Sequence, residues 1–348
     1  MPQPVGYYVH HHGIGHWRRA VAVARAMATP CTLIGTFNAA QQAAAPGATL
    51  NLADDAPVPG ATPGVPPPLL HYAPLRHSGL RRRSAALAAW MGEADPALLV
   101  VDVSAEAALL ARLCSVPVAL FRLAGRRDDP PHLHAFAAAQ HLVAPFPAAL
   151  EDSATPDWVV EKTFYAGFLT DVAAGTAPVA ERSVTVVFGQ GGTGGDAFAL
   201  AAAARATPGW RWRVIGPVSG DAPPPANLEL LGWVADPQPL LAGAAVLVGG
   251  AGDGLVAEAA ALAKPFLCLP EPRPFGEQTL KAQRLAELGA ACVLPAWPAA
   301  GDWPGLLDRA LALDPARIGA LHAPGAVGRL AGWLDGVASA ASPETGDD

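Results

Sequence analysis

A short apolar run, a glycine-rich turn and an alanine-rich stretch follow one another in residues 183–206, which read SVTVVFGQGGTGGDAFALAAAARA. The run Ser183–Phe188 has the length and composition of a fully buried strand. The stretch Ala197–Ala206 is typical of a helix, so Gly189–Gly195 forms a turn from strand into helix. A strand that leads into a helix in this way indicates one unit of a parallel α/β sheet.

Strands and helices alternate in the same way along most of the chain. Strands are predicted at Val5–Val9, Thr32–Gly35, Leu98–Val103, Pro117–Phe121, His141–Ala144, Ser183–Phe188, Trp212–Ile215, Leu228–Leu230, Ala245–Val248 and Phe266–Leu269. Helices are predicted at Arg18–Met27, Ala105–Leu113, Ala197–Ala206, Pro237–Ala242, Gly254–Ala263, Gln278–Leu288 and Trp303–Leu313. His141–Ala144 is expected to be the last strand of the first half. A loop over 165–182 divides the chain into two doubly wound α/β domains, 1–166 and 167–324.

The composition bounds the class of protein. Of the 348 residues, 51% are hydrophobic and 15% are charged, which is enough apolar material for two large cores. The net charge of −7 provides no basic field for nucleic acid. No signal peptide and no run of about 18 apolar residues is apparent, so we expect a cytoplasmic protein without a membrane span. The four cysteines lack metal-binding spacing, and no metal site is expected.

The first glycine-rich turn spans residues 10–16, HHHGIGH, between a strand and a helix. Its spacing is not G-x-G-x-x-G, and no acidic residue follows where a ribose partner is expected, which argues against a nicotinamide enzyme. A histidine at the carboxyl end of a strand suits general-base catalysis, since its ordinary pKa is about 6.5. We predict His16 as that base, His12 as the second choice, and His10 as a continuation of the strand. Because glycine lets the backbone approach a ligand closely, donor contacts are predicted for Gly13 and Gly15.

Two more glycine-rich turns occur in the second half. Five glycines in Gly189–Gly195 leave little side chain to pack, and a backbone nest for an anion explains such a turn. Residues 249–254, GGAGDG, lead into a helix whose N-terminus favours a diphosphate, and Glu258 follows one turn later to accept ribose hydroxyls. Asp196 is predicted to cap a helix. The donor contacts predicted here are Gly189, Gln190, Gly191, Gly192, Thr193, Gly250, Gly252, Asp253, Gly254 and Glu258.

Two further polar groups are open to more than one interpretation. Asp102 lies at the end of a predicted buried strand, where it either orients His16 or caps the helix Ala105–Leu113. The basic run Arg81–Arg83 either contacts anionic lipid headgroups or forms a solvated helix face. Three charges are few for membrane binding, so the solvated face is favoured.

These motifs together resemble glycosyltransferase family 28, whose best-known member completes the lipid-linked peptidoglycan precursor. Gly15-His16 matches the end of the family's first glycine loop, and Gly189–Gly195 matches the second. Residues 232–234, Gly-Trp-Val, resemble the segment whose backbone reads uracil. The resemblance therefore implies base contacts by Trp233 and Val234.

The resemblance continues towards the C-terminus. The stretch from Gly250 to Pro265 has the family spacing, in which a glutamate at the position of Glu258 binds ribose. Residues 270–282 resemble the sugar-reading loop, which implies hexose contacts by Glu277 and Gln278. Glu277 stands where the family has glutamine, and Asp253 stands where it has a small residue.

The resemblance implies a GT-B fold, in which two Rossmann-like domains face a central cleft and a C-terminal helix over 325–340 packs back on the first domain. It implies an inverting, metal-independent glycosyltransferase that moves a hexose from a nucleoside diphosphate, UDP before others, to a hydroxyl group, with no cofactor. The acceptor is left open between a lipid-linked molecule and a small metabolite, and peripheral membrane contact is left open with it. The alternatives are a nucleotide-sugar hydrolase on the same fold and a non-catalytic sugar-nucleotide-binding protein.

Overall fold

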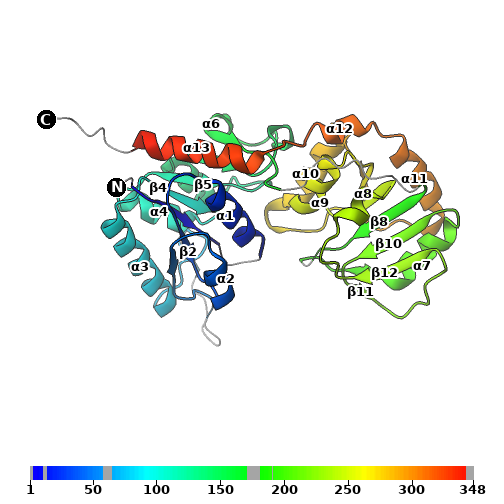
Figure 1. Cartoon of the computed structure of the whole chain (residues 1–348), viewed down its shortest axis with the longest axis horizontal. Helices are drawn as coiled ribbons and strands as arrows, with labels where there is room; N and C mark the ends of the chain where they lie inside the picture. The colour runs from blue at the N-terminus through cyan, green and yellow to red at the C-terminus, as the bar shows by residue number, and fades with distance from the viewer. Residues whose placement is uncertain (1–2, 11–13, 58–64, 171–180, 190, 342–348) are drawn as a thin grey trace.

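The computed structural model describes residues 3–10, 14–57, 65–170, 181–189 and 191–341, which form two α/β domains (Figure 1). The N-terminal domain has seven parallel strands in the order β3-β2-β1-β4-β5-β6-β7. They are β1 (Val5–Tyr8), β2 (Cys31–Gly35), β3 (Thr49–Asn51), β4 (Leu98–Asp102), β5 (Val118–Phe121), β6 (His141–Ala144) and β7 (Thr163–Tyr165). Its helices are α1 (Ile14–Ala26), α2 (Ala39–Ala44), α3 (Ser78–Ala94), α4 (Ala105–Leu113), α5 (Pro130–Ala138), η1 (Ala148–Leu150) and α6 (Asp157–Glu161).

The C-terminal domain has six parallel strands in the order β12-β10-β8-β13-β14-β15 and a small two-stranded sheet of β9 and β11. The strands are β8 (Ser183–Val187), β9 (Gly195–Asp196), β10 (Arg211–Ile215), β11 (Val218–Ser219), β12 (Leu228–Gly232), β13 (Val246–Gly249), β14 (Phe266–Cys268) and β15 (Cys292–Val293). The helices are α7 (Ala197–Ala206), α8 (Gln238–Ala242), α9 (Asp253–Ala261), η2 (Pro274–Gly276), α10 (Glu277–Glu287), η3 (Ala300–Asp302), α11 (Trp303–Leu311) and α12 (Pro315–Gly319).

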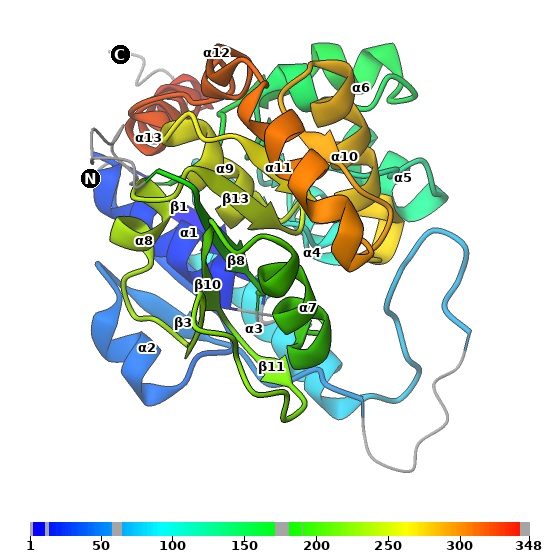
Figure 2. The ribbon, with the colours of Figure 1, turned by 90° about the vertical axis from the view of Figure 1, so that its right-hand side faces the viewer.

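Helices cover both faces of each sheet, which explains why the central strands are apolar on both sides. Figure 2 shows α7 and α8 on opposite sides of β8 and β10. One core of the C-terminal domain packs α7 and α11 against this sheet, with Trp212 and Trp303 edge to face at 4.9 Å between ring centroids. Both predicted doubly wound α/β domains are therefore confirmed.

The last helix, α13 (Ala326–Ala341), lies on the N-terminal domain rather than on the domain that precedes it (Figure 1). Its Leu330 and Leu334 are buried in the same core as residues of β1 and α1. Trp333 stacks on Phe164 with ring centroids 4.5 Å apart. Asp335 accepts the backbone N–H groups of residues 28 and 29 at 2.9 and 3.0 Å. The N-terminal domain is thus built from both ends of the chain.

Several predicted elements need correction. His141–Ala144 is not the last strand of the first domain, because Thr163–Tyr165 pairs with it as β7. Helix α1 begins at Ile14 instead of Arg18, so His16 lies in its first turn. The strands β3 and β15 were missed, since two or three residues carry no readable periodicity.

The predicted solvated face of Arg81–Arg83 is wrong for one of the three residues. Arg81 and Arg82 are exposed on α3, whereas only 4% of the Arg83 side chain is exposed. Arg83 Nη1 lies 2.7 Å from Asp55 Oδ1, and Arg83 Nη2 donates to the Tyr8 hydroxyl at 2.9 Å. Asp55 lies in a loop far from Arg83 in the sequence, so spacing along the chain does not predict this ion pair.

Candidate active site

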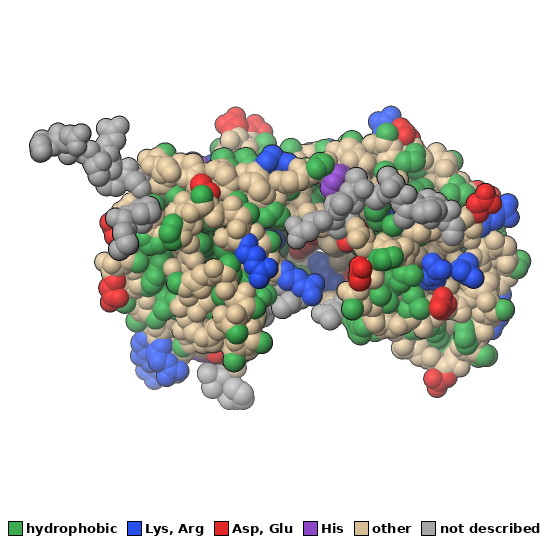
Figure 3. Space-filling view, viewed as in Figure 1, with side chains coloured by type: hydrophobic (Ala, Val, Ile, Leu, Met, Phe, Trp, Pro, Cys, Tyr) green, Lys and Arg blue, Asp and Glu red, His purple; other side chains and the backbone are tan. Residues whose placement is uncertain are grey.

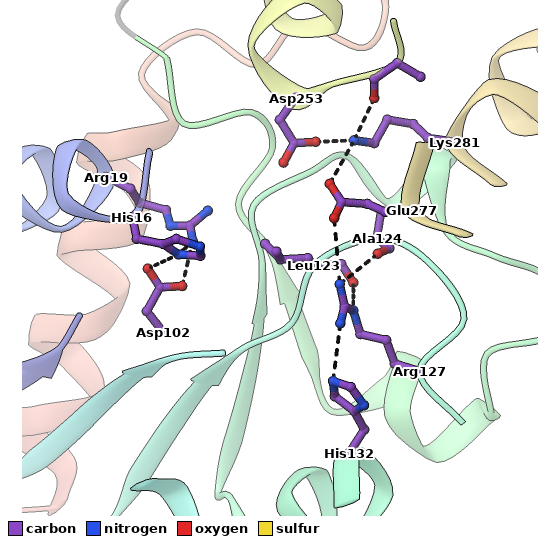
Figure 4. A network of polar contacts seen from close by, with 11 residues as sticks. His16, Arg19, Asp102, Leu123, Ala124, Arg127, His132, Asp253, Glu277 and Lys281 are labelled. Carbon is purple, nitrogen blue, oxygen red and sulfur yellow. Dashed lines mark hydrogen bonds and ion pairs between the residues drawn. The ribbon is translucent and has the colours of Figure 1, made fainter. Parts of the chain in front are cut away.

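Both sheets reverse their strand order at one place, and the predicted site residues gather there. The N-terminal sheet reverses between β1 and β4; His16 follows β1 in the chain, and Asp102 ends β4. The C-terminal sheet reverses between β8 and β13, which lead into Gly189 and Gly250. Ligands of open α/β sheets bind outside the carboxyl ends of the strands at such a point. The surface is hollowed between the two domains (Figure 3). His16 and Asp102 lie on one side in Figure 4, and Asp253, at the start of the helix after Gly250, lies on the other.

His16, Arg19 and Asp102 form a polar cluster on the N-terminal side of the cleft (Figure 4). His16 Nδ1 lies 2.9 Å from Asp102 Oδ2, and Arg19 Nη2 donates to Asp102 Oδ1 at 2.6 Å. Arg19 Nη2 also lies 2.9 Å from His16 Nδ1. The histidine and the arginine are three residues apart on α1, so they share one helix face. Asp102 is fully buried, while the side chains of His16 and Arg19 are 17% and 13% exposed, so His16 is the most exposed of the three.

Charge and hydrogen bonding fix the state of this cluster. Burial by itself raises the pKa of Asp102, but the Arg19 charge and the His16 hydrogen bond outweigh it and hold that pKa below its ordinary value. Asp102 Oδ2 and Arg19 Nη2 both lie 2.9 Å from His16 Nδ1, so the tautomer decides which of them it pairs with. With the hydrogen on Nδ1, the carboxylate accepts it and the lone pair is on Nε2. This is how an acid orients a general base. Asp102 does not cap α4, because Ser104 does so by accepting the Ala107 N–H at 3.2 Å.

The other residues of the first turn are placed unevenly. His12 and Gly13, predicted as the second base and a donor contact, lie outside the described residues. Gly15 is exposed, with open space where a Cβ would lie. His10 does not continue the strand, since β1 ends at Tyr8; its ring centroid lies 5.4 Å from that of His16. Sequence reasoning missed His10 because the strand was predicted one residue too long.

A pocket of about 580 Å³ lies on the C-terminal side of the cleft. Its size falls within the roughly 300–1,000 Å³ of small-molecule sites. Six predicted donor residues line it, namely Gly189, Thr193, Gly250, Gly252, Gly254 and Gln278. Residues that the sequence did not single out complete the lining, among them Phe188, Glu271 and Arg273. Trp297, which was expected to be a core or rim residue, also lines it. The structure therefore brings the second and third glycine turns together around one space.

The second glycine turn lies against the loop that follows β14. A Cβ on Gly192 would lie 2.0 Å from Glu271 Oε1, and one on Gly191 would lie 3.3 Å from Arg273 Nη2. A side chain at either position would therefore displace the ends of the Glu271 and Arg273 side chains. Gln190 lies outside the described residues. Asp196 caps α7 as predicted, since its side chain accepts the Ala199 N–H at 2.8 Å.

The third glycine turn presents a helix N-terminus to the pocket. Helix α9 begins at Asp253 after Gly252, which offers no side-chain cap, so the first N–H groups of the helix remain available to an anion. Gln278 Oε1 accepts the N–H groups of Ala251 and Glu271, each at 3.0 Å. The predicted sugar contact of Gln278 is thereby limited to its Nε2, because Oε1 ties the turn to the next loop.

Lys281 joins the two acidic residues that depart from the family pattern, and sequence reasoning missed it. Its buried ammonium pairs with Asp253 and lies 4.0 Å from Glu277 Oε1 (Figure 4). Burial and the charge of Asp253 raise the pKa of Glu277, although Lys281 and Arg127 oppose this. Arg127 belongs to the other domain and lies 3.9 Å from Glu277 Oε2. The available signal was position, since Lys281 is four residues after Glu277 on one helix.

The residues predicted to bind the nucleoside are not among those that line the pocket. Trp233 is 57% exposed and Val234 is half-buried, in the segment between β12 and α8. Glu258 has its Oε2 buried without a hydrogen-bond partner. Burial and the nearby Asp236 raise the pKa of Glu258. A buried carboxylate oxygen without a donor is the kind of group that a ribose hydroxyl would satisfy.

One cluster in the described part of the chain has the composition of a metal site. The ligand atoms of His71, Asp129 and His132 lie within 4.8 Å of one another. His132 Nδ1 is 2.6 Å from Asp129 Oδ2, and its Nε2 is 3.2 Å from Arg127 Nη1. Because the guanidinium donates to Nε2, the hydrogen of His132 is on Nδ1 and points to Asp129. Burial and the adjacent Arg127 lower the pKa of His132 to about 4, although Asp129 opposes them. The cluster is thus satisfied by its own hydrogen bonds.

Comparison with known proteins agrees with this geometry. Residues 219–300 match the glycosyltransferase family 28 C-terminal domain, and this range holds the third glycine turn and Glu258. No protein with a curated description matches the chain in sequence. None of the helices in the described residues combines the length and apolar character needed to cross a membrane.

Solved structures resemble the chain over nearly its whole length. The calicheamicin glycosyltransferase CalG4 is 17% identical, with a TM-score of 0.68 over 99% of this chain and 100% of that one. UGT2 of Phytolacca americana, complexed with UDP-2-fluoro-glucose and pterostilbene, is 14% identical, with a TM-score of 0.68 over 97% and 100%. MurG of Acinetobacter baumannii is 16% identical, with a TM-score of 0.63 over 96% and 100%. The chain has the GT-B fold, and its residues 219–300 match the C-terminal domain of glycosyltransferase family 28.

Proposed function

We propose that this protein is an inverting, metal-independent glycosyltransferase that moves a hexose from UDP to the hydroxyl group of an acceptor. The observation that carries the proposal is the position of His16, oriented by Asp102, opposite the pocket of the glycine turns. One side of the cleft offers a base and the other offers backbone N–H groups to a diphosphate. The UDP-sugar in the complex of UGT2 supports a UDP donor.

The donor lies on the C-terminal side in this proposal. Its diphosphate approaches the third glycine turn, where the N-terminus of α9 has N–H groups without a side-chain cap. Its ribose meets the buried Oε2 of Glu258, which has no partner in the protein. The hexose then extends towards Glu277, whose carboxylate lies within 4.0 Å of both Lys281 and Arg127.

The chemistry is a single displacement. The acceptor oxygen attacks the anomeric carbon from the face opposite the diphosphate, and its proton passes to His16 Nε2. The bond between the anomeric carbon and the diphosphate oxygen breaks, and its electron pair leaves with UDP, so the configuration inverts. Backbone N–H groups and the α9 dipole stabilise the charge that develops on the leaving group. Asp102 stabilises the imidazolium that forms, and Arg19 keeps Asp102 ionised.

A donor and acceptor screen tests the proposal. The full chain is incubated with UDP-hexoses and thymidine diphosphate hexoses, with and without hydroxylated acceptors, and products are identified by mass spectrometry and by the anomeric coupling in their NMR spectra. We expect transfer from a UDP-hexose with inverted configuration, at a rate that EDTA does not change. Release of free hexose without acceptor at about 1–1,000 per second would establish a hydrolase instead. A chain that binds no sugar nucleotide contradicts the proposal.

A further inference from the structure

The N-terminal domain contains a cavity of about 460 Å³ that the donor chemistry leaves unused. Residues of β1, α3, α4 and the loop before α3 line it. Most of its wall is apolar, and its larger apolar side chains are Leu52, Leu80, Leu87 and Leu110. Two tyrosines, Tyr8 and Tyr72, add flat ring surfaces. The cavity therefore suits a ring-containing molecule of moderate size.

One wall residue of the cavity lies beside the proposed base. His10 is part of its wall, and the ring centroid of His10 lies 5.4 Å from that of His16. A molecule held in the cavity thus has a short path to the imidazole.

Arg83 is the one Lys or Arg side chain among the described residues that line the cavity, and its charge is already paired. Arg83 Nη1 lies 2.7 Å from Asp55 Oδ1 and donates to the Ala53 carbonyl at 3.0 Å. Its Nη2 donates to the Tyr8 hydroxyl at 2.9 Å. With its donors held in this way, Arg83 has little attraction left for a phosphate or carboxylate in the cavity.

Glu106 adds a negative charge that no such pair balances. Its Oε1 accepts the N–H groups of His71 at 2.6 Å and Tyr72 at 3.0 Å. It lies in the first turn of α4, where the helix dipole favours an anion. No Lys or Arg in the described part of the chain lies within ion-pair distance of it. An anion that enters the cavity therefore meets a fixed carboxylate.

We propose that this cavity holds an apolar, ring-containing acceptor without negative charge, and that Glu106 is the residue that rejects anionic acceptors. The inference rests on the proposed transferase function and deepens it. It favours a small molecule over a diphosphate-bearing lipid as the acceptor, because the cavity offers a carboxylate where a phosphate would need a cation.

Two probes with the same rings and different charge test the proposal. 2-Naphthol is uncharged at pH 7, and 6-hydroxy-2-naphthoate carries one negative charge. Their dissociation constants are measured by calorimetry on the full chain saturated with UDP. We expect 2-naphthol to bind about tenfold or more tightly, since like charges in a poorly solvated cavity repel.

Two pairs of variants assign the effect to this cavity. Glu106→Gln retains an oxygen for the two backbone N–H groups, and we expect it to bring the two probes within about twofold. Glu93→Gln removes an exposed charge from α3 outside the cavity and serves as the control, with the preference unchanged. Ser84→Phe fills the cavity and should abolish 2-naphthol binding, whereas Ser84→Ala should retain it.

Equal binding of the two probes to the parent chain, or an unchanged preference in Glu106→Gln, overturns the proposal. Retention of 2-naphthol binding in Ser84→Phe that unfolds at the temperature of the parent overturns the location. UDP binding is measured in each sample as a separate quantity. Its loss in the parent chain counts against the transferase function, whereas normal UDP binding without a preference between probes counts against this inference alone.

Discussion

The two main sheets have the same strand order, apart from the additional edge strand β7 of the N-terminal sheet, and they place different chemistry at the same point of it. At its reversal point, the N-terminal sheet presents side chains, the buried carboxylate of Asp102 and the imidazole of His16. The C-terminal sheet presents mainly backbone, in the glycine turns that begin at Gly189 and Gly249. The same topology therefore supports a base on one side and an anion cradle on the other.

This difference indicates that the two sides of the cleft have separate chemical roles. A proton acceptor needs a titratable side chain in a fixed orientation, which a buried ion pair supplies. A diphosphate needs several donors that do not repel it or move, which glycine turns and a helix N-terminus supply. The division predicts that substitutions on the two sides damage different measured quantities.

The largest effect is expected for His16→Ala. Loss of the base should lower kcat by roughly 100- to 10,000-fold, the usual contribution of a general base. The rate is measured with the acceptor found in the screen, and Arg18→Ala, which removes an exposed side chain of the same helix, is the control. A near-normal kcat in His16→Ala beside an inactive His12→Ala would transfer the role to His12 and keep the division between domains.

A smaller effect, on stability, is expected for Asp102→Asn. The substitution leaves Arg19 mostly buried without its counter-charge, and such a loss costs about 3–5 kcal/mol. Urea unfolding at pH 7 measures it, with Asp308→Asn on the exposed side of α11 as the control. An equal loss of stability in Asp102→Asn and Asp308→Asn would show that the buried carboxylate contributes no more than an exposed one.

The pH dependence of that loss follows from the lowered pKa of Asp102. A carboxyl with a depressed pKa stabilises the folded chain above the pKa of the unfolded state, and this stabilisation disappears as the pH falls through the lower folded-state pKa. The gap between the parent and Asp102→Asn should therefore be full at pH 7 and shrink in acid. A gap that grows in acid is incompatible with the ionised cluster.

The smallest effect is expected on the donor side of the cleft, in the thermal stability of a Glu258 variant. Burial and Asp236 raise the pKa of Glu258, so ionised Glu258 destabilises the folded chain without nucleotide above its folded-state pKa. Glu258→Gln should raise Tm at pH 7, and the gain should shrink as the pH falls below that pKa and vanish below the pKa of the unfolded state. Thermal unfolding measures it, and Glu181→Gln at an exposed position should leave Tm unchanged at both pH values. A lower Tm in Glu258→Gln at pH 7 would mean that the carboxylate is already satisfied.

The sequence predicts much of the fold because apolar runs and glycine turns are local signals. The turn Gly189–Gly195 and the helix after it are placed within a residue of their observed positions. Short elements such as β3 were missed, since three residues carry no periodicity. The helix α3 was not delimited, and with it the burial of Arg83 was missed, because its ion pair joins segments 28 residues apart.

The site is predicted less completely than the fold. His16 and Asp102 could be proposed from their positions at strand ends, yet the choice between orienting and capping roles for Asp102 required the position of Ser104. Lys281 was missed because its contacts are made across a helix turn. Arg127 could be proposed as a clamp for an anionic acceptor group or as part of an ion-pair network at the rim, but its contact with Glu277 across the cleft could not be predicted. Local sequence patterns predict which segments lie next to a ligand. The charges around that ligand depend on tertiary contacts, which those patterns do not contain.

The central claim is that the two sides of the cleft divide base and nucleotide between them, and one calorimetric titration tests it most directly. UDP is titrated into the full chain, into His16→Ala and into Glu258→Ala. The account predicts an affinity within about twofold of the parent for His16→Ala. It predicts a loss of roughly 10- to 150-fold for Glu258→Ala, since hydrogen bonds to a charged group contribute about 1.5–3 kcal/mol. Parent-like affinity in Glu258→Ala together with lost affinity in His16→Ala would contradict it.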